Sequence, residues 1–204
     1  MRFGKTLLAV VGAAVVLSAL VGSASAGRLS LSSGTWRVTF ASLTLRYLEE
    51  INAATCAITL EGSFHARSIV KRANTLFGYV TRAATGSCSL GSATLLTETL
   101  PWHVRYQSFA GTLPNITSMG IDIVGLAIRT RGINGTICLT ITMTTEPLRL
   151  RLTRETVTRA LLEAEAEGEV HAEVGCLSAP GRFTGRSGSV SVQGSATRIT
   201  VTLI

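Results

Sequence analysis

Strict alternation of apolar and polar residues is the feature that most restricts what this chain can fold into. In the segment "LRLRLTR", Leu148, Leu150 and Leu152 alternate with Arg149 and Arg151. Successive side chains of a β-strand point to opposite faces, whereas an α-helix repeats every 3.6 residues. The segment is therefore predicted to be a strand with one buried and one solvent-facing side.

The same period of two recurs in three further segments, "GTWRVTF", "CAITLEGSFHA" and "WHVRYQ". Each places large apolar side chains on one face and charged or hydroxyl side chains on the other. The predicted inward sets are Trp36, Val38 and Phe40; Cys56, Ile58 and Leu60; and Trp102, Val104 and Tyr106.

Aromatic and histidine residues gather in "LPWHVRYQSFAGTLPNIT", although aromatic residues make up only 5% of the chain. Such a cluster is typical either of a ligand site or of one well-packed strand. The alternation favours packing, with Trp102 and Tyr106 in the core. We expect His103, Arg105 and Gln107 to point to the surface.

Other segments are less uniform. In "TICLTITMTT" one face carries Leu139, Ile141 and Met143 and the other carries threonines, while "IDIVGLAIRT" is apolar enough for a central strand covered on both faces. Residues 42–54 are predicted to be strand followed by loop. Residues 153–168 fit one short helix, with an alternating strand as the alternative.

The composition agrees with strands, since Thr, Val, Ile, Ser and Gly are abundant and there are only four prolines. Turn clusters such as "TGSCSLGS" and "TRGINGT" separate the apolar runs. No repeat of fixed period is found. We predict an all-β fold, a single antiparallel β-sandwich or barrel with at most one short helix.

The first residues indicate export. Arg2 and Lys5 precede an apolar run over 7–21, and small residues end in Ala24 and Ala26. This order is typical of a secretory signal peptide, and the run is shorter than the roughly 20 apolar residues of a membrane span. We expect a signal peptide over 1–26 and a single secreted β-domain over 27–204, secreted or associated with the cell envelope and not an integral membrane protein.

The cysteines of the exported chain are even in number, which favours disulfide bonds over free thiols. They are Cys56, Cys88, Cys138 and Cys176. Three pairings are open to four cysteines, and the sequence alone does not select one. We favour Cys56 with Cys88 and Cys138 with Cys176, because sequential pairing closes the shorter loops. The C-x-x-C spacing of a zinc site is absent.

Motifs for catalysis or cofactor binding are missing. Neither a phosphate-binding glycine loop nor a G-x-S-x-G motif occurs, and His65, His103 and His171 lie in no metal-binding spacing. The single aspartate, Asp122, could orient His103 toward Ser108 as a triad, but such trios arise freely in serine-rich chains. We predict no catalytic residues, cofactor or metal.

The charge pattern offers one binding hypothesis. The formal net charge is +7, or about +5 without Arg2 and Lys5, and arginine supplies nearly all of the positive charge. A basic face is predicted for anionic cell-wall polymer or lipid headgroups if the carrying strands are neighbours. Its members would be Arg129, Arg131, Arg149 and Arg151. The alternative is a solvated sheet face, and nucleic acid is not an expected partner.

The segments "CAITLEGSFHARSIVK" and "LPWHVRYQSFAGTLPNIT" resemble secreted β-rich proteins of high-GC actinobacteria that have no known function. The resemblance implies export and β architecture and assigns no site residue. We therefore expect a non-enzymatic, disulfide-stabilised β-domain that acts as an envelope or extracellular binding or structural module. The alternative is a secreted hydrolase or a carrier of lipid or another small molecule.

Overall fold

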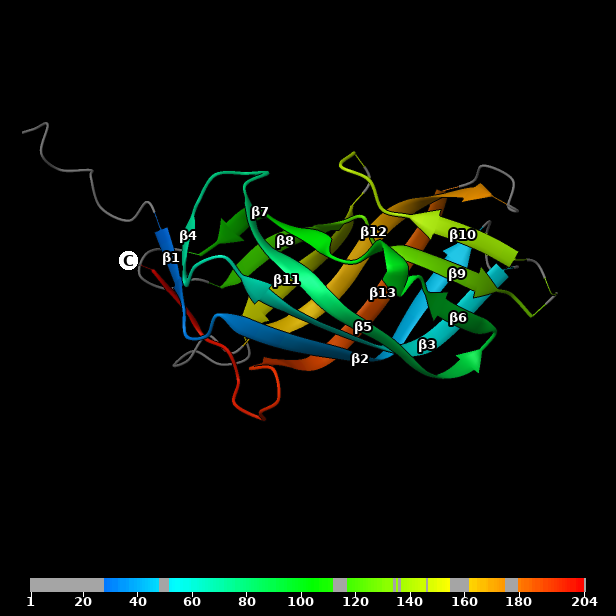
Figure 1. Cartoon of the computed structure of the whole chain (residues 1–204), viewed down its shortest axis with the longest axis horizontal. Helices are drawn as coiled ribbons and strands as arrows, with labels where there is room; N and C mark the ends of the chain where they lie inside the picture. The colour runs from blue at the N-terminus through cyan, green and yellow to red at the C-terminus, as the bar shows by residue number, and fades with distance from the viewer. Residues whose placement is uncertain are drawn as a thin grey trace, which may run out of the picture.

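The computed structural model describes residues 28–47, 52–111, 117–133, 135, 137–145, 147–154, 162–174 and 180–203. The predicted all-β class is confirmed (Figure 1). The elements are β1 Arg28–Leu31, β2 Thr35–Tyr47, β3 Asn52–Phe64, β4 Ser68–Val70, β5 Leu76–Leu90, β6 Ser92–Leu95, the 3₁₀ turn η1 Thr97–Thr99, β7 Trp102–Ala110, β8 Ser118–Val124, β9 Ala127–Arg131, β10 Ile137–Ile141, β11 Leu148–Arg154, β12 Leu162–Val174, β13 Pro180–Ser191 and β14 Val201–Leu203.

The strands close into an antiparallel barrel. The hydrogen-bonded order is β11, β8, β7, β5, β3, β2, β13 and β12, and the additional pairing of β11 with β12 completes the ring. Every pairing in this ring is antiparallel. A ring of about eight strands is just wide enough for inward side chains to fill it.

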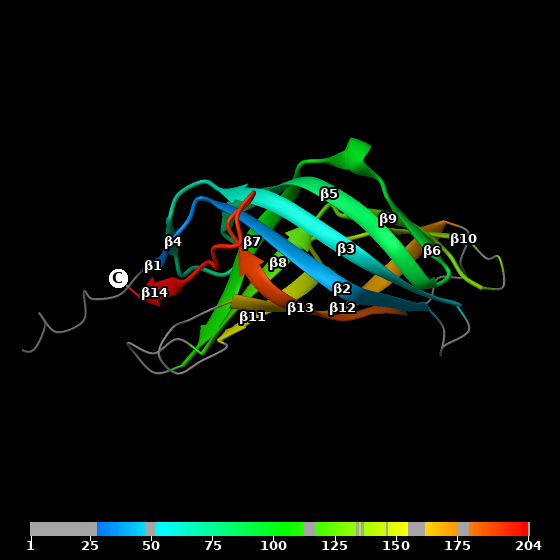
Figure 2. The ribbon, with the colours of Figure 1, turned by 90° about the horizontal axis from the view of Figure 1, so that it is seen from below.

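The barrel has a second half, because several of its strands are longer than their neighbours. The first residues of β12 pair with β11, but its last residues pair with β10, which continues the sheet through β9 to β6. Likewise β5 pairs with β7 only near its start, and its far part lies beside β6. Figure 2 shows β6, β9 and β10 at one end of the molecule.

A small separate sheet lies at the opposite end (Figures 1 and 2). In it β1 pairs with both β4 and β14. Its Leu29, Leu31 and Ile69 join the same hydrophobic core as the barrel strands. This sheet therefore covers one end of the apolar interior and brings the first and last described strands together.

The predicted inward faces of the barrel strands are confirmed. Trp36, Val38 and Phe40, then Cys56, Ile58 and Leu60, then Trp102, Val104 and Tyr106, and then Leu148, Leu150 and Leu152 are all buried. Close packing also explains one glycine. A Cβ at Gly62 would collide with the indole of Trp36 and the carbonyl of Tyr79, so only glycine fits at this point of β3.

Of the two structures that the sequence left open for residues 153–168, a short helix or an alternating strand, the strand is present wherever the structure describes this segment. Residues 162–168 belong to β12, whose alternating glutamates pair in register with both β11 and β13. Neighbouring strands on both sides satisfy the backbone of this segment, and tertiary pairing overrides its helical propensity. Residues 155–161 lie outside the described part of the chain, as does the predicted signal peptide over 1–26.

One further expectation fails between β8 and β9. The segment "IDIVGLAIRT" is not one strand, since Gly125, with φ of 91°, separates β8 from β9. The alternation predicted for "TICLTITMTT" is present, and it is the threonine side that faces inward: Thr140 in β10 and Thr142 just after it are buried. The Thr142 hydroxyl accepts a hydrogen bond from the Leu126 backbone N–H at 3.0 Å, which satisfies a donor just after the break.

The disulfide bond predicted between Cys56 and Cys88 is present and links β3 to β5 inside the barrel. Cys138 is also disulfide-bonded. Its predicted partner, Cys176, lies outside the described residues, so that pairing stays a prediction.

We predict that replacing Trp102 by Ala lowers the free energy of unfolding by about 3 to 5 kcal/mol, as loss of a buried aromatic side chain does. The Trp102 side chain is buried, and its indole N–H donates to Thr99 Oγ1 at 2.7 Å. His103→Ala should cost about 1 kcal/mol or less, because this exposed ring loses only its contact with Tyr79. Urea denaturation of both variants would test this order, and equal losses would contradict it.

We predict that removing the Cys56–Cys88 bond costs about 3 to 4 kcal/mol, since it closes a loop with a sequence separation of 32 residues. The double variant Cys56→Ala with Cys88→Ala, compared by urea denaturation with the oxidised protein, measures this cost. Mass mapping of non-reduced peptides should also recover Cys138 joined to Cys176. Any fragment that joins Cys138 to Cys56 or Cys88 would contradict both assignments.

Burial raises the pKa of the Tyr106 phenol above its ordinary value of 10.0. The unfolded chain therefore loses this proton first as the pH rises. The contribution of the neutral phenol to the free energy of unfolding is therefore fully present below the unfolded-state pKa of 10.0. It is lost as the pH rises through the higher pKa of the folded state. We expect Tyr106→Phe to lose less stability than the wild type between pH 9 and pH 11 in urea denaturation. Parallel losses in the two proteins would contradict the assignment.

Candidate functional site

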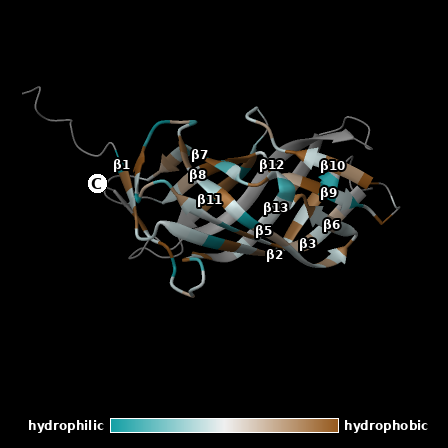
Figure 3. Cartoon of the chain, viewed as in Figure 1, coloured by the Kyte–Doolittle hydropathy of each residue, from teal (hydrophilic) through white to brown (hydrophobic). Residues whose placement is uncertain are grey.

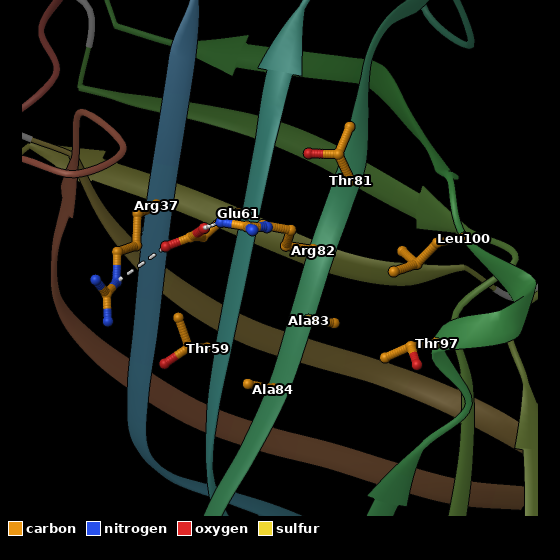
Figure 4. A pocket seen from close by; sticks show the side chains of 9 residues that line it. All are labelled: Arg37, Thr59, Glu61, Thr81, Arg82, Ala83, Ala84, Thr97 and Leu100. Carbon is orange, nitrogen blue, oxygen red and sulfur yellow. Dashed lines mark ion pairs between the residues drawn. The ribbon is translucent and has the colours of Figure 1, made fainter.

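A pocket of about 420 Å³ lies on the outer wall of the barrel, where β2, β3 and β5 run beside the η1 turn (Figure 4). We call it the wall groove. The short side chains of Thr59 on β3 and Ala84 on β5, which are paired in register, lie at its base. The η1 turn borders one side. The lining residues are Arg37, Thr59, Glu61, Thr81, Arg82, Ala83, Ala84, Thr97 and Leu100.

A row of three charged side chains lies across the groove. The strand register places Arg37 and Arg82 on either side of Glu61. Arg37 Nε lies 3.6 Å from Glu61 Oε1, and Arg82 Nη1 lies 3.9 Å from Oε2 (Figure 4). Gln193 Nε2 donates to Oε2 at 2.9 Å, so the carboxylate has polar partners on three sides.

The carboxylate of this row is largely buried, whereas the two guanidinium groups are accessible to solvent. The Glu61 side chain is only 16% exposed, whereas those of Arg37 and Arg82 are 47% and 76% exposed. One carboxylate neutralises one of two positive charges, so the row keeps a net positive charge. Several guanidinium N–H groups remain available to solvent, and guanidinium groups bind carboxylate and phosphate oxygens well. The groove is therefore suited to an anionic group.

A second row of the same kind lies on β7, β8 and β11, where the register aligns Arg105, Asp122 and Arg149. Arg149 Nε contacts Asp122 Oδ1 at 3.2 Å, and Gln107 Nε2 donates to Oδ2 at 2.7 Å. Asp122 is 3% exposed, so its charge is compensated locally. Arg149 is thus engaged in holding a buried acid.

The four arginines of the predicted basic face do not lie on neighbouring strands. Arg129 and Arg131 are on β9, which pairs with β10 and β6, while Arg149 and Arg151 are on β11, which pairs with β8 and β12. All four are exposed. The condition on which a single four-arginine face depended is therefore not met, and the two pairs must be considered separately.

The triad considered for Asp122, His103 and Ser108 is not assembled. Both carboxylate oxygens of Asp122 bind Gln107 and Arg149 instead. The His103 ring lies against Tyr79, at 5.5 Å between centroids. Ser108 is opposite Gly120 on β8.

The candidate metal ligands are dispersed as well. His65 packs on the other side of Tyr79, at 4.9 Å between centroids, and His171 is on β12. Among the described residues, no group of three or more His, Cys, Asp or Glu side chains could hold a metal ion. In the same part of the chain, no helix is long and apolar enough to cross a membrane.

No protein-family model matches the chain, and comparisons with curated proteins and with solved structures find no match. The resemblance of residues 56–71 and 100–117 to secreted actinobacterial proteins therefore stays a prediction.

Sequence reasoning missed the wall groove, although part of its signal was available. Arg37 and Glu61 both occupy outward positions of predicted strands that follow one another along the chain. A hairpin of these strands would place them side by side. Arg82 of β5 lies beside Glu61 only because the register of β3 and β5 shifts at this point, and no sequence pattern indicates that shift.

Proposed function

We propose that this protein is an exported binding module, and that its wall groove holds an acidic segment of an extracellular or envelope polymer. The row of Arg37, Glu61 and Arg82 carries the proposal. It combines two exposed guanidinium groups with one largely buried carboxylate, so a bound carboxylate or phosphate would meet a net positive charge.

The position of the groove favours this function over that of a carrier with a ligand inside the barrel. Trp102, Phe40 and Phe183 are among the largest fully buried side chains, and they belong to one continuous core. A lumen filled in this way resembles a small packed barrel more than a ligand-holding one. The wall groove, in contrast, opens to solvent at the surface, where a long polymer can lie.

Export agrees with two observations of different kinds. The first residues have the order of a signal peptide, and a disulfide bond joins Cys56 to Cys88. An envelope polymer that carries phosphate or uronic acid groups is a ligand of the chemistry that the groove would recognise. The secreted hydrolase that the sequence left open gains no support, because the geometry of the candidate triad is absent.

We predict that the wild-type protein binds teichoic acid weakly, and that Arg37→Gln with Arg82→Gln reduces its affinity by about tenfold, since two charge-assisted contacts are lost. A matched control removes two exposed arginines elsewhere, in Arg67→Gln with Arg72→Gln, and should retain most of the affinity. Isothermal titration calorimetry at low and high salt, with neutral dextran as the negative ligand, measures both.

Equal losses in the two double variants would show that only the net charge of the protein matters, which would contradict a groove site. Absence of binding at low salt would contradict the proposal altogether. Cooperative urea transitions in both variants would show that they remain folded, and only a small decrease in midpoint is expected where Glu61 loses two half-exposed or exposed partners.

A further inference from the structure

The outer face of β10 is apolar, which is the reverse of the pattern in the barrel strands. Ile137 and Met143 are 43% and 38% exposed, while Leu139 and Ile141 between them are half-buried. The alternate positions, among them Cys138 and Thr140, are buried. An apolar stripe therefore faces outward along this strand. Figure 3 marks the hydrophobic residues on the ribbon of β10.

The stripe leads to a hairpin turn that exposes one apolar side chain. Ile133 is 71% exposed in the turn between β9 and β10, where the Gly135 N–H donates to the Gly132 carbonyl at 3.0 Å. Turns normally present polar residues or glycine to water. Leu90, 36% exposed at the end of β5, lies next to this region, because Ser92, two residues later, pairs with Arg131.

Two arginines border the apolar residues. Arg131 lies directly opposite Ile137, and Arg129 lies opposite Leu139. Both arginines are exposed, and within the described part of the chain neither makes an ion pair. This differs from Arg37, Arg82 and Arg149, which all contact a carboxylate. Unpaired cations beside exposed apolar side chains form an amphipathic edge.

We propose that this edge, which comprises the outer face of β10, the tip at Ile133 and the flanking Arg129 and Arg131, docks on an anionic lipid surface. Apolar side chains at a protruding tip can enter the boundary between headgroups and acyl chains, while guanidinium groups beside them bind lipid phosphates. The edge does not overlap the wall groove, and the inference does not rest on the proposed function.

Charge distinguishes this occupant from a second copy of the chain. In a two-fold symmetric dimer formed through the stripe, the same patch of each copy would meet. The arginines of both copies would then be brought together, and no ion pair among the described residues balances them. A surface rich in lipid phosphate supplies the opposite charge and covers the apolar residues at the same time.

Co-sedimentation with vesicles of phosphatidylglycerol, and with vesicles of phosphatidylcholine as the neutral reference, tests the inference on the exported chain. We expect binding to the anionic vesicles only. Arg129→Gln with Arg131→Gln should weaken it by about thirtyfold, because each basic residue near such a surface contributes roughly a factor of five. Ile133→Ser with Ile137→Thr should weaken it by about tenfold and abolish the part that persists in 1 M salt, where charges are screened within about 3 Å.

Matched controls lie at the other end of the molecule. Arg67→Gln with Arg72→Gln removes the same charge, and Val70→Thr changes a side chain that is 47% exposed. Both should bind the vesicles nearly as the wild type does, as should Arg37→Gln with Arg82→Gln in the groove. Equal weakening in the charge control, or no effect of the isoleucine changes, would overturn the inference. A concentration-dependent dimer in analytical ultracentrifugation, with no vesicle binding, would assign the edge to self-association instead.

Discussion

The continuous apolar interior is the constraint on which the rest of this structure depends. Strands β2, β3, β5, β12 and β13 are each long enough to serve both halves of the barrel, and β12 exchanges β11 for β10 as its neighbour along its length. The described inward positions of these strands, such as Phe40 of β2 and Leu60 of β3, are buried in one core, where an unpaired polar group would be costly. Most buried side chains of the described residues are correspondingly apolar, and the ion pairs among these residues lie on the outer wall.

This division explains which features the sequence could reveal. Alternation predicted the inward faces around Trp36, Ile58 and Trp102 because burial on one side of a strand leaves a direct trace in residue type. Residues 162–168 stayed open between helix and strand because glutamate and alanine favour helices locally, while the pairing with β11 and β13 that makes them a strand is decided by distant segments. The row of Arg37, Glu61 and Arg82 could not be predicted, because it depends on the order of β2, β3 and β5 in the sheet and on a register shift next to Glu61. Neither is visible in the local sequence pattern.

The same arrangement of charged residues occurs twice on the outer wall, and one of the two leaves its arginines beside an open pocket. In both rows a carboxylate on a central strand lies in register between arginines of the two neighbouring strands. Gln107 and Arg149 cover Asp122 almost completely, so that row serves the stability of the sheet. Around Glu61 the short side chains of Thr59 and Ala84, which are paired in register, line the hollow, and the arginines remain accessible. The size of the neighbouring side chains, more than the charges themselves, therefore distinguishes a candidate binding site from a structural ion pair.

The inverted strand β10 follows from the break at Gly125. Ending β8 and starting β9 in a new direction leaves backbone groups near Leu126 without strand partners, and Thr142 provides them: its N–H donates to the Leu126 carbonyl at 2.8 Å, and its hydroxyl accepts from the Leu126 N–H. Because side chains alternate along a strand, an inward Thr142 also commits Thr140 to the interior and turns Leu139 and Ile141 outward. The apolar stripe beside Arg129 and Arg131 is thus coupled to a local hydrogen-bonding need of the fold, and a lipid surface that covers the stripe would offset the cost of exposing it.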